Sequence, residues 1–111
     1  MNVIGSDVIR GYTDTMILFL LLDEPSYGYE VSKSIENLSE GAYRIKETTL
    51  YSAFGRLERN GYIESFPGNV TFGKPRTYYR ITEKGREYYR EKCDEWKRTK
   101  NLVERFINLE A

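Results

Sequence analysis

Between residues 48 and 82 the sequence changes from the periodicity of a helix to that of two β-strands. Apolar residues recur at i, i+3, i+4 and i+7, the spacing of one narrow helical stripe over residues 48–60; they are Leu50, Ala53, Phe54 and Leu57. Gly61 follows, where a left-handed glycine commonly ends a helix. Two runs rich in aromatic and β-branched residues come next, separated by Gly and Pro, and they predict a β-hairpin with a long loop.

Three further helices are expected. An apolar run rich in Leu and Met predicts a first helix over residues 9–22, which must be covered on more than one side because it is apolar all round. A short second helix, with Ser26 as its N-cap, is predicted by apolar residues at helical spacing: Tyr27, Val31, Ile35 and Leu38. Thr82 caps a final helix over residues 83–109, whose apolar residues recur about every 3.5 residues, as in a coiled coil.

The composition restricts the chemistry that the chain can perform. Its 111 residues fit one domain. The absence of His and the presence of one Cys, Cys93, exclude a His general base, a Cys-His pair, an intrachain disulfide and a His or Cys metal cluster. We expect no enzymatic activity, cofactor or metal, although composition alone leaves carboxylate and Tyr chemistry open. The longest apolar run, 16–22, is far shorter than the roughly 20 residues of a membrane helix, and the start does not resemble a signal peptide, so we expect a cytoplasmic protein.

Charge is balanced over the whole chain but unevenly distributed along it. Lys and Arg number 17 and Asp and Glu number 17, which gives a net charge of zero. No acidic residue occurs between residues 65 and 82, whereas Lys74, Arg76 and Arg80 do. The hairpin is therefore expected to create a local positive field on a neutral protein.

The order of the predicted elements indicates a winged helix-turn-helix. The second and third helices form the helix-turn-helix, and the hairpin forms the wing. The major groove of DNA admits one exposed helix, which needs a buried stripe behind and small or donor-bearing side chains in front. The third helix has both features. The side chains of this helix that can donate to phosphates or bases are Thr48, Thr49, Ser52, Arg56 and Arg59. The hairpin loop adds two cations, Lys74 and Arg76.

These residues also have a plainer interpretation. Taken alone, the third-helix face is equally well an ordinary solvated surface, and loop cations are common; the adjoining hairpin without acidic residues favours DNA. Gly55 on the exposed face costs roughly 1 kcal/mol relative to Ala, and a close approach of the backbone to DNA is one use for it. Gly28 is interpreted as a packing glycine near a helix start, and Tyr51 is also suited to pack at the base of the wing.

Three stretches in the same order resemble transcriptional regulators of the PadR family: residues 26–30, 47–63 and 73–85. Together they span most of the chain, and the single C-terminal helix resembles the short subgroup of that family. The resemblance implies a mainly α fold with a small β-hairpin, in which residues 1–82 form a DNA-binding winged helix-turn-helix and residues 83–111 a dimerisation helix, within one compact unit. It also implies a homodimeric repressor whose DNA contacts include Thr49, Tyr51, Arg56, Lys74 and Arg76.

Trp96 lies on the apolar stripe of the last predicted helix. The residue pattern alone favours a place in a dimer core. Some members of the resembled subgroup bind flat aromatic molecules between the subunits against a Trp at this position. The expected partners are thus a near-palindromic DNA operator, a second copy of the chain and a planar aromatic effector, with no membrane. The alternative function is a winged-helix protein-interaction module that does not bind DNA; an acidic or apolar third-helix face would favour it, and this sequence has neither.

Overall fold

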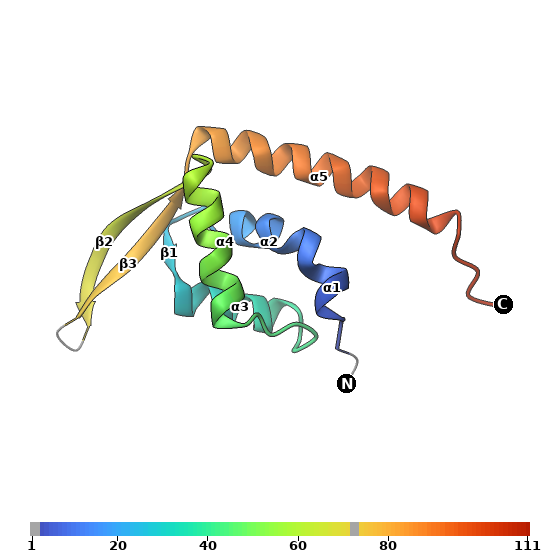
Figure 1. Cartoon of the computed structure of the whole chain (residues 1–111), viewed down its shortest axis with the longest axis horizontal. Coiled ribbons are helices and arrows are strands. Elements are labelled where there is room, and N and C mark those ends of the chain that lie inside the picture. Colours follow the sequence, from blue (N-terminus) through green and yellow to red (C-terminus); the bar gives the residue numbers. More distant parts are fainter. Residues whose placement is uncertain (1–2, 72–73) are drawn as a thin grey trace.

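The computed structural model describes residues 3–71 and 74–111, and the side chains of residues 69–75 lie outside the described part. The helices are α1 (Ser6–Ile9), the 3-10 helix η1 (Arg10–Tyr12), α2 (Thr13–Leu20), α3 (Gly28–Leu38), α4 (Glu47–Arg59) and α5 (Glu83–Glu104); the strands are β1 (Ser26–Tyr27), β2 (Ile63–Thr71) and β3 (Lys74–Ile81). In Figure 1 the hairpin projects from one end of the helical body, and α5 runs over the body towards the other end. The fold is the predicted one, mainly helical with a small antiparallel sheet.

The hydrophobic core lies where α2, α3 and α4 meet the base of the hairpin. The apolar stripe predicted for the third helix is confirmed, because all four of its residues are buried. They pack with buried residues of the neighbouring elements: Ile17, Leu18, Leu21, Val31, Ile35 and Ile63. Phe54 also stacks on Tyr79 of β3, with ring centroids 4.1 Å apart. The core thus fixes the inner face of α4 and leaves its outer face towards solvent.

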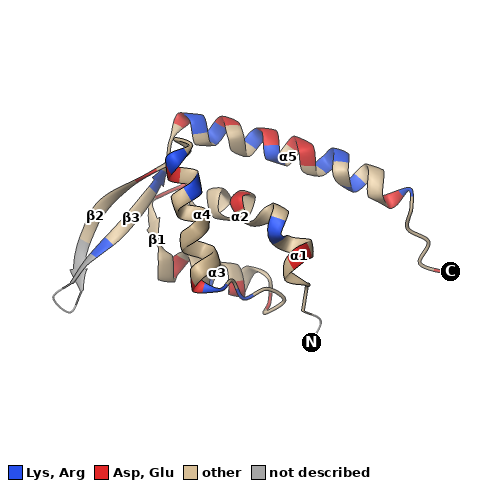
Figure 2. Cartoon of the chain, viewed as in Figure 1, with Lys and Arg blue, Asp and Glu red and all other residues tan. Residues whose placement is uncertain are grey.

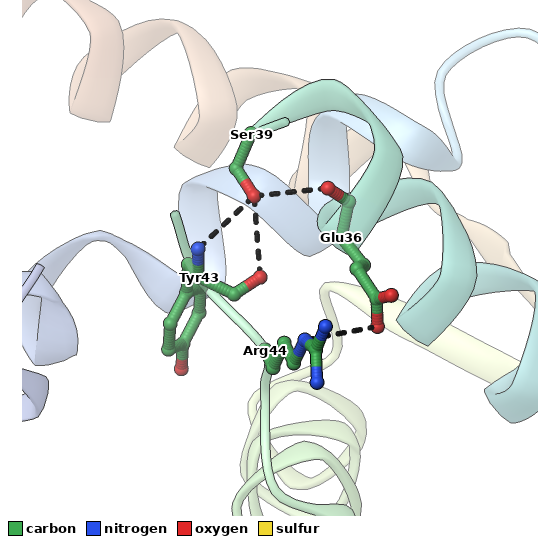
Figure 3. A network of polar contacts seen from close by, with 4 residues as sticks. All are labelled: Glu36, Ser39, Tyr43 and Arg44. Atoms are coloured by element: carbon green, nitrogen blue, oxygen red, sulfur yellow. Dashed lines mark hydrogen bonds and ion pairs between the residues drawn. The ribbon is translucent and has the colours of Figure 1, made fainter. Parts of the chain in front are cut away.

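Ser39 organises the turn between α3 and α4 (Figure 3). Its Oγ lies 3.1 Å from the carbonyl oxygen of Glu36 and accepts a hydrogen bond of 3.1 Å from the N–H of Tyr43. Arg44 adds an ion pair to the Glu36 carboxylate at 3.8 Å. Gly41, with φ of 80°, occupies the left-handed region, which glycine adopts without strain. These contacts hold α4 at a fixed orientation relative to α3.

The sheet has three strands in the order β1-β3-β2, so one strand more than the predicted hairpin. Ser26 pairs with Tyr79 and Tyr27 with Tyr78, both antiparallel. The prediction that Ser26 is the N-cap of α3 is wrong, since Tyr27 holds that position and has no side-chain capping bond. Pairing with β3 keeps Ser26 extended within a strand, one residue before the cap, and its hydroxyl instead donates to the Glu30 carboxylate.

Two predicted helices have different bounds in the structure. The helix expected over residues 9–22 is divided into α1, η1 and α2, with Gly11, a poor helix former, in the 3-10 turn. The cap at Thr82 is confirmed, because its Oγ1 accepts from the N–H of Gly85 at 3.0 Å. The last helix ends at Glu104 instead of residue 109, and the next residues form i→i−3 turns with exposed side chains. A helix end without tertiary packing is not stabilised beyond its intrinsic propensity.

Candidate nucleic-acid interface

The outer face of α4 is polar and open. All six residues that the sequence predicts there are exposed: Thr48, Thr49, Tyr51, Ser52, Arg56 and Arg59. The acidic residue near the end of this helix is engaged elsewhere, because the Glu58 carboxylate accepts from Ser65 Oγ at 2.6 Å and from Ser65 N at 3.1 Å. These two hydrogen bonds connect α4 to β2, and they hold the Glu58 carboxylate beside the base of the hairpin.

Arg56 has a partner within the protein. Its Nη2 donates to Oδ1 of Asp14 on α2, and the side chains of Arg56 and Asp14 are 47% and 16% exposed. The residue pattern alone predicted Arg56 on the DNA face and indicated no partner for it. A carboxylate 42 residues away left no sequence signal, since only the packing of α2 against α4 brings the two groups together. Arg56 thus reaches solvent with only part of its guanidinium.

Tyr51 lies between the core and the surface, 48% exposed. Its ring meets Phe54 edge-on, with centroids 5.7 Å apart. Its hydroxyl end lies against Gly28 at the start of α3. The interpretation of Gly28 as a packing glycine is confirmed.

The cations of the hairpin differ in their surroundings. Lys74 begins β3, and its side chain lies outside the described part. The guanidinium carbon of Arg76 lies 4.1 Å from the ring centroid of Tyr27, a cation–π contact that joins β3 to the start of α3. Arg80 is paired with Glu64 across the hairpin, at 2.9 Å, and therefore contributes less positive field than Arg76. Figure 2 shows basic residues on β3 and charges of both signs along α5.

Tyr79 connects strand β3 of the hairpin to helix α4. Its ring stacks on Phe54, and burial, with smaller effects of Glu58 and Tyr51, raises the pKa of Tyr79 above its ordinary value of 10.0. The tyrosine is therefore neutral at physiological pH and serves as packing surface. Tyr79 is partly buried and packs against the hydrophobic core.

Trp96 lies on α5, away from the α4 face. The residue is 46% exposed, and its indole meets the ring of Tyr12 edge-on, with centroids 5.4 Å apart. A cavity of about 360 Å³ adjoins the pair, and residues of α1 and α5 line it. At its edge Lys92 Nζ donates to Glu95 at 2.7 Å, and this hydrogen bond is the main cause that raises the pKa of Lys92.

A helix-turn-helix that continues into a β-hairpin, with hydroxyl and guanidinium groups on its second helix, defines the winged helix-turn-helix class. Residues 17–91 match the family described as the transcriptional regulator PadR-like family. The chain belongs to this family, whose members are transcriptional regulators and not enzymes. Within the described residues no helix has both the length and the apolar content needed to cross a membrane.

Solved structures of the family resemble the chain closely. A transcriptional regulator from Clostridium thermocellum is 57% identical, with a TM-score of 0.88, and the match covers 96% of this chain and 100% of that one. A PadR family regulator from Clostridium difficile is 32% identical, with a TM-score of 0.74, over 88% of this chain and 100% of that one. PadR of Bacillus subtilis, solved in complex with operator DNA, shares the fold at 18% identity and a TM-score of 0.65, over 72% of this chain and 45% of that one.

Proposed function

We propose that this regulator is a homodimeric repressor that binds a near-palindromic operator in duplex DNA. The observation that carries the proposal is the division of α4 into a fully buried apolar face and an outer face of hydroxyl and guanidinium groups beside a basic hairpin. The solved complex of Bacillus subtilis PadR with operator DNA supports this use of the shared fold. The proposed DNA contacts are Thr48, Thr49, Tyr51, Ser52, Arg56, Arg59, Lys74 and Arg76. Such a regulator acts where the DNA lies, in the cytoplasm.

Residues 1–82 are proposed to bind DNA and residues 83–111 to form the dimer, within one unit. Contacts across the boundary support a rigid connection. Tyr88 of α5 stacks on Tyr62 with ring centroids 4.0 Å apart, and Arg86 Nη2 donates to the carbonyl oxygen of Leu22 at 2.8 Å. A displacement of α5 in the dimer would therefore carry the DNA-binding part with it.

Exposed apolar side chains support the homodimer. Phe106 and Leu109 after α5 are 80% and 94% exposed, and Val3 and Val8 near the N-terminus are exposed as well. An apolar groove of about 320 Å³ also adjoins α2 and α3, lined largely by Met16, Phe19, Leu20, Ile35, Leu38 and Tyr89. A second copy of the chain would cover such surfaces, and a two-fold axis would set two α4 helices about 34 Å apart for successive major grooves. Sedimentation equilibrium tests this: a monomer at micromolar concentration contradicts it.

Selection of bound sequences from a random duplex library tests DNA recognition. We expect enrichment of an inverted repeat whose half-sites are one helical turn apart. Enrichment of single half-sites would contradict binding to DNA as a dimer. Absence of any enrichment, at low and moderate salt, would contradict DNA recognition and favour the alternative, a winged-helix module that binds other proteins.

A planar aromatic molecule is the proposed effector that relieves repression. The half-exposed Trp96, its edge contact with Tyr12 and the adjacent cavity support this role. Quenching of the single Trp by a panel of planar aromatic compounds measures binding. Because coupling between two ligands is reciprocal, an effector that weakens DNA binding must itself bind less tightly in the presence of operator DNA. If no compound quenches Trp96, its role is restricted to packing.

A further inference from the structure

A polar cleft lies beside α4, where η1 and the start of α2 approach its outer face. It has a volume of about 280 Å³ and lies between η1, the start of α2 and the outer face of α4. Apart from Ala53, its lining consists of cations and hydroxyl groups: Arg10, Thr13, Thr48, Thr49, Ser52 and Arg56. The residue pattern alone predicted no role for Arg10 or Thr13.

Positive charge dominates this cleft. Arg10 is exposed and forms no ion pair with any carboxylate in the described part of the chain. Arg56 shares its guanidinium with Asp14, so the three groups together carry one net positive charge. A guanidinium that is free of a carboxylate presents several N–H donors in a plane, a geometry suited to the oxygens of a phosphate.

Thr13 provides a second, independent indication of a ligand. The residue is only 3% exposed, and among the described residues its Oγ1 has no hydrogen-bond partner. Buried hydroxyl groups are rarely left without a partner, because a lost hydrogen bond costs about 1–3 kcal/mol. The hydroxyl itself is covered, but Thr13 lines the cleft, so a rotation of its side chain would bring this hydroxyl to an acceptor bound there.

The N-terminus of α4 opens at the same place. Its N-cap residue, Lys46, makes no side-chain capping bond, and Thr48 and Thr49 belong to the first turn of a helix of 13 residues. The N–H groups of a first turn have no acceptor inside the helix and carry partial positive charge. These N–H groups and the guanidinium of Arg10 line the same cleft, and both are suited to an oxyanion.

We propose that this cleft binds a phosphate of the DNA backbone on the side of α4 opposite the wing. The inference rests on the proposed DNA binding. The hairpin lies on one side of α4, and α1 and α2 lie on the other (Figure 1). A helix in the major groove has a row of phosphates on each side, so the wing contacts one row and the cleft the other. Asp14 competes with that phosphate for Arg56 and limits the affinity.

Two substitutions with opposite expected effects on DNA affinity test the cleft in the full-length protein. The measurement is fluorescence anisotropy with the selected operator and with a random duplex, over a series of salt concentrations. Arg10→Ala is expected to weaken binding to both duplexes by the same factor and to reduce the slope of log K against log salt by about 0.9 for each cleft in contact. Asp14→Asn is expected to strengthen binding to both duplexes. Arg80→Ala, which removes a hairpin cation already paired with Glu64, is the control and should keep nearly the wild-type affinity and salt slope.

A titration with inorganic phosphate separates this inference from the proposed function. Amide N–H correlation spectra of the wild type should show shifts centred on Thr48 and Thr49, and Arg10→Ala should abolish them. A wild-type salt slope for Arg10→Ala, or weaker DNA binding by Asp14→Asn, overturns the inference while DNA recognition stands. If the wild type binds no DNA, the proposed function fails, and the phosphate titration alone then decides whether the cleft binds an oxyanion.

Discussion

Gly28 and Tyr51 are packed so closely that a larger residue at the start of α3 would displace the Tyr51 ring. A Cβ atom at Gly28 would lie 2.8 Å from Cζ of Tyr51 and still closer to its hydroxyl oxygen. The obstructing atoms are at the free end of a side chain that is half exposed. A methyl group at Gly28 would therefore displace the Tyr51 ring and leave the backbone where it is.

Gly28→Ala should accordingly separate DNA binding from stability. We expect a change of at most about 1 kcal/mol in the free energy of unfolding, because Ala is the better helix former and only one ring must move. Operator affinity should fall towards that of Tyr51→Ala, since Tyr51 loses its position on α4. Urea denaturation and anisotropy measure the two quantities. Operator binding at wild-type affinity by both variants would show that Tyr51 does not contact DNA.

Gly85→Ala, in contrast, should mainly reduce the stability of the fold. A Cβ at Gly85 would lie 2.8 Å from Cγ1 of Ile81 and 2.9 Å from the carbonyl carbon of Tyr62, and nearer still to the Tyr62 oxygen. Backbone cannot rotate away like a side chain, so α5 must shift, and we expect a loss of about 3 kcal/mol in urea denaturation. Gly11→Ala is the control, because nothing lies within 4 Å of a Cβ there. Equal stability of the two variants would contradict this packing.

The parts of the fold that follow from local sequence were predicted well. The buried stripe of α4, the turn at Gly61 with φ of 79° and the Thr82 cap each depend on residues only a few positions apart. Strand β1 was missed because two residues, Ser26 and Tyr27, carry no periodicity, and their extended form depends on pairing with β3.

The candidate site was predicted as a set of residues but not as a geometry. The outer residues of α4 are exposed, as the spacing of its apolar stripe predicted. The contacts of the site's arginines come from distant segments. Asp14 forms an ion pair with Arg56, and the ring of Tyr27 forms a cation–π contact with Arg76. Such pairs depend on tertiary packing, which spacing along one helix or one loop does not reveal.

Gly55→Ala tests whether the backbone of α4 approaches DNA. The nearest atom to a Cβ at this position is Arg59 Nη1, at 3.3 Å, and that flexible side chain can move aside. Ala should therefore stabilise the helix by about 1 kcal/mol. Operator affinity should fall if the new methyl group lies between helix and groove. A variant that is both more stable and equally tight in DNA binding would show that Gly55 does not face DNA.

Alkaline pH should destabilise the protein through three partly buried tyrosines. Burial raises the pKa of Tyr79 above 10.0, and also raises the pKa of Tyr88 and Tyr89. Below pH 10 both folded and unfolded states hold these protons; above it the unfolded state releases them first, so the free energy of unfolding falls as pH rises. Tyr79→Phe should reduce this pH dependence in urea titrations. Identical pH profiles for wild type and Tyr79→Phe would contradict it.

Cations of the wing should contribute unequally to DNA binding. Lys74→Ala and Arg76→Ala are each expected to reduce the salt slope by about 0.9 per subunit in contact with DNA and to weaken binding similarly on all sequences, as expected for phosphate contacts. Arg76→Lys keeps the charge but loses the contact of the guanidinium with the Tyr27 ring. It should therefore have the wild-type salt slope but a lower affinity than the wild type. Arg80→Ala is the matched control from the same strand, because Glu64 already neutralises Arg80 and the variant should keep nearly the wild-type slope. Equal effects of Arg76→Ala and Arg80→Ala would show that the wing acts only through its total charge.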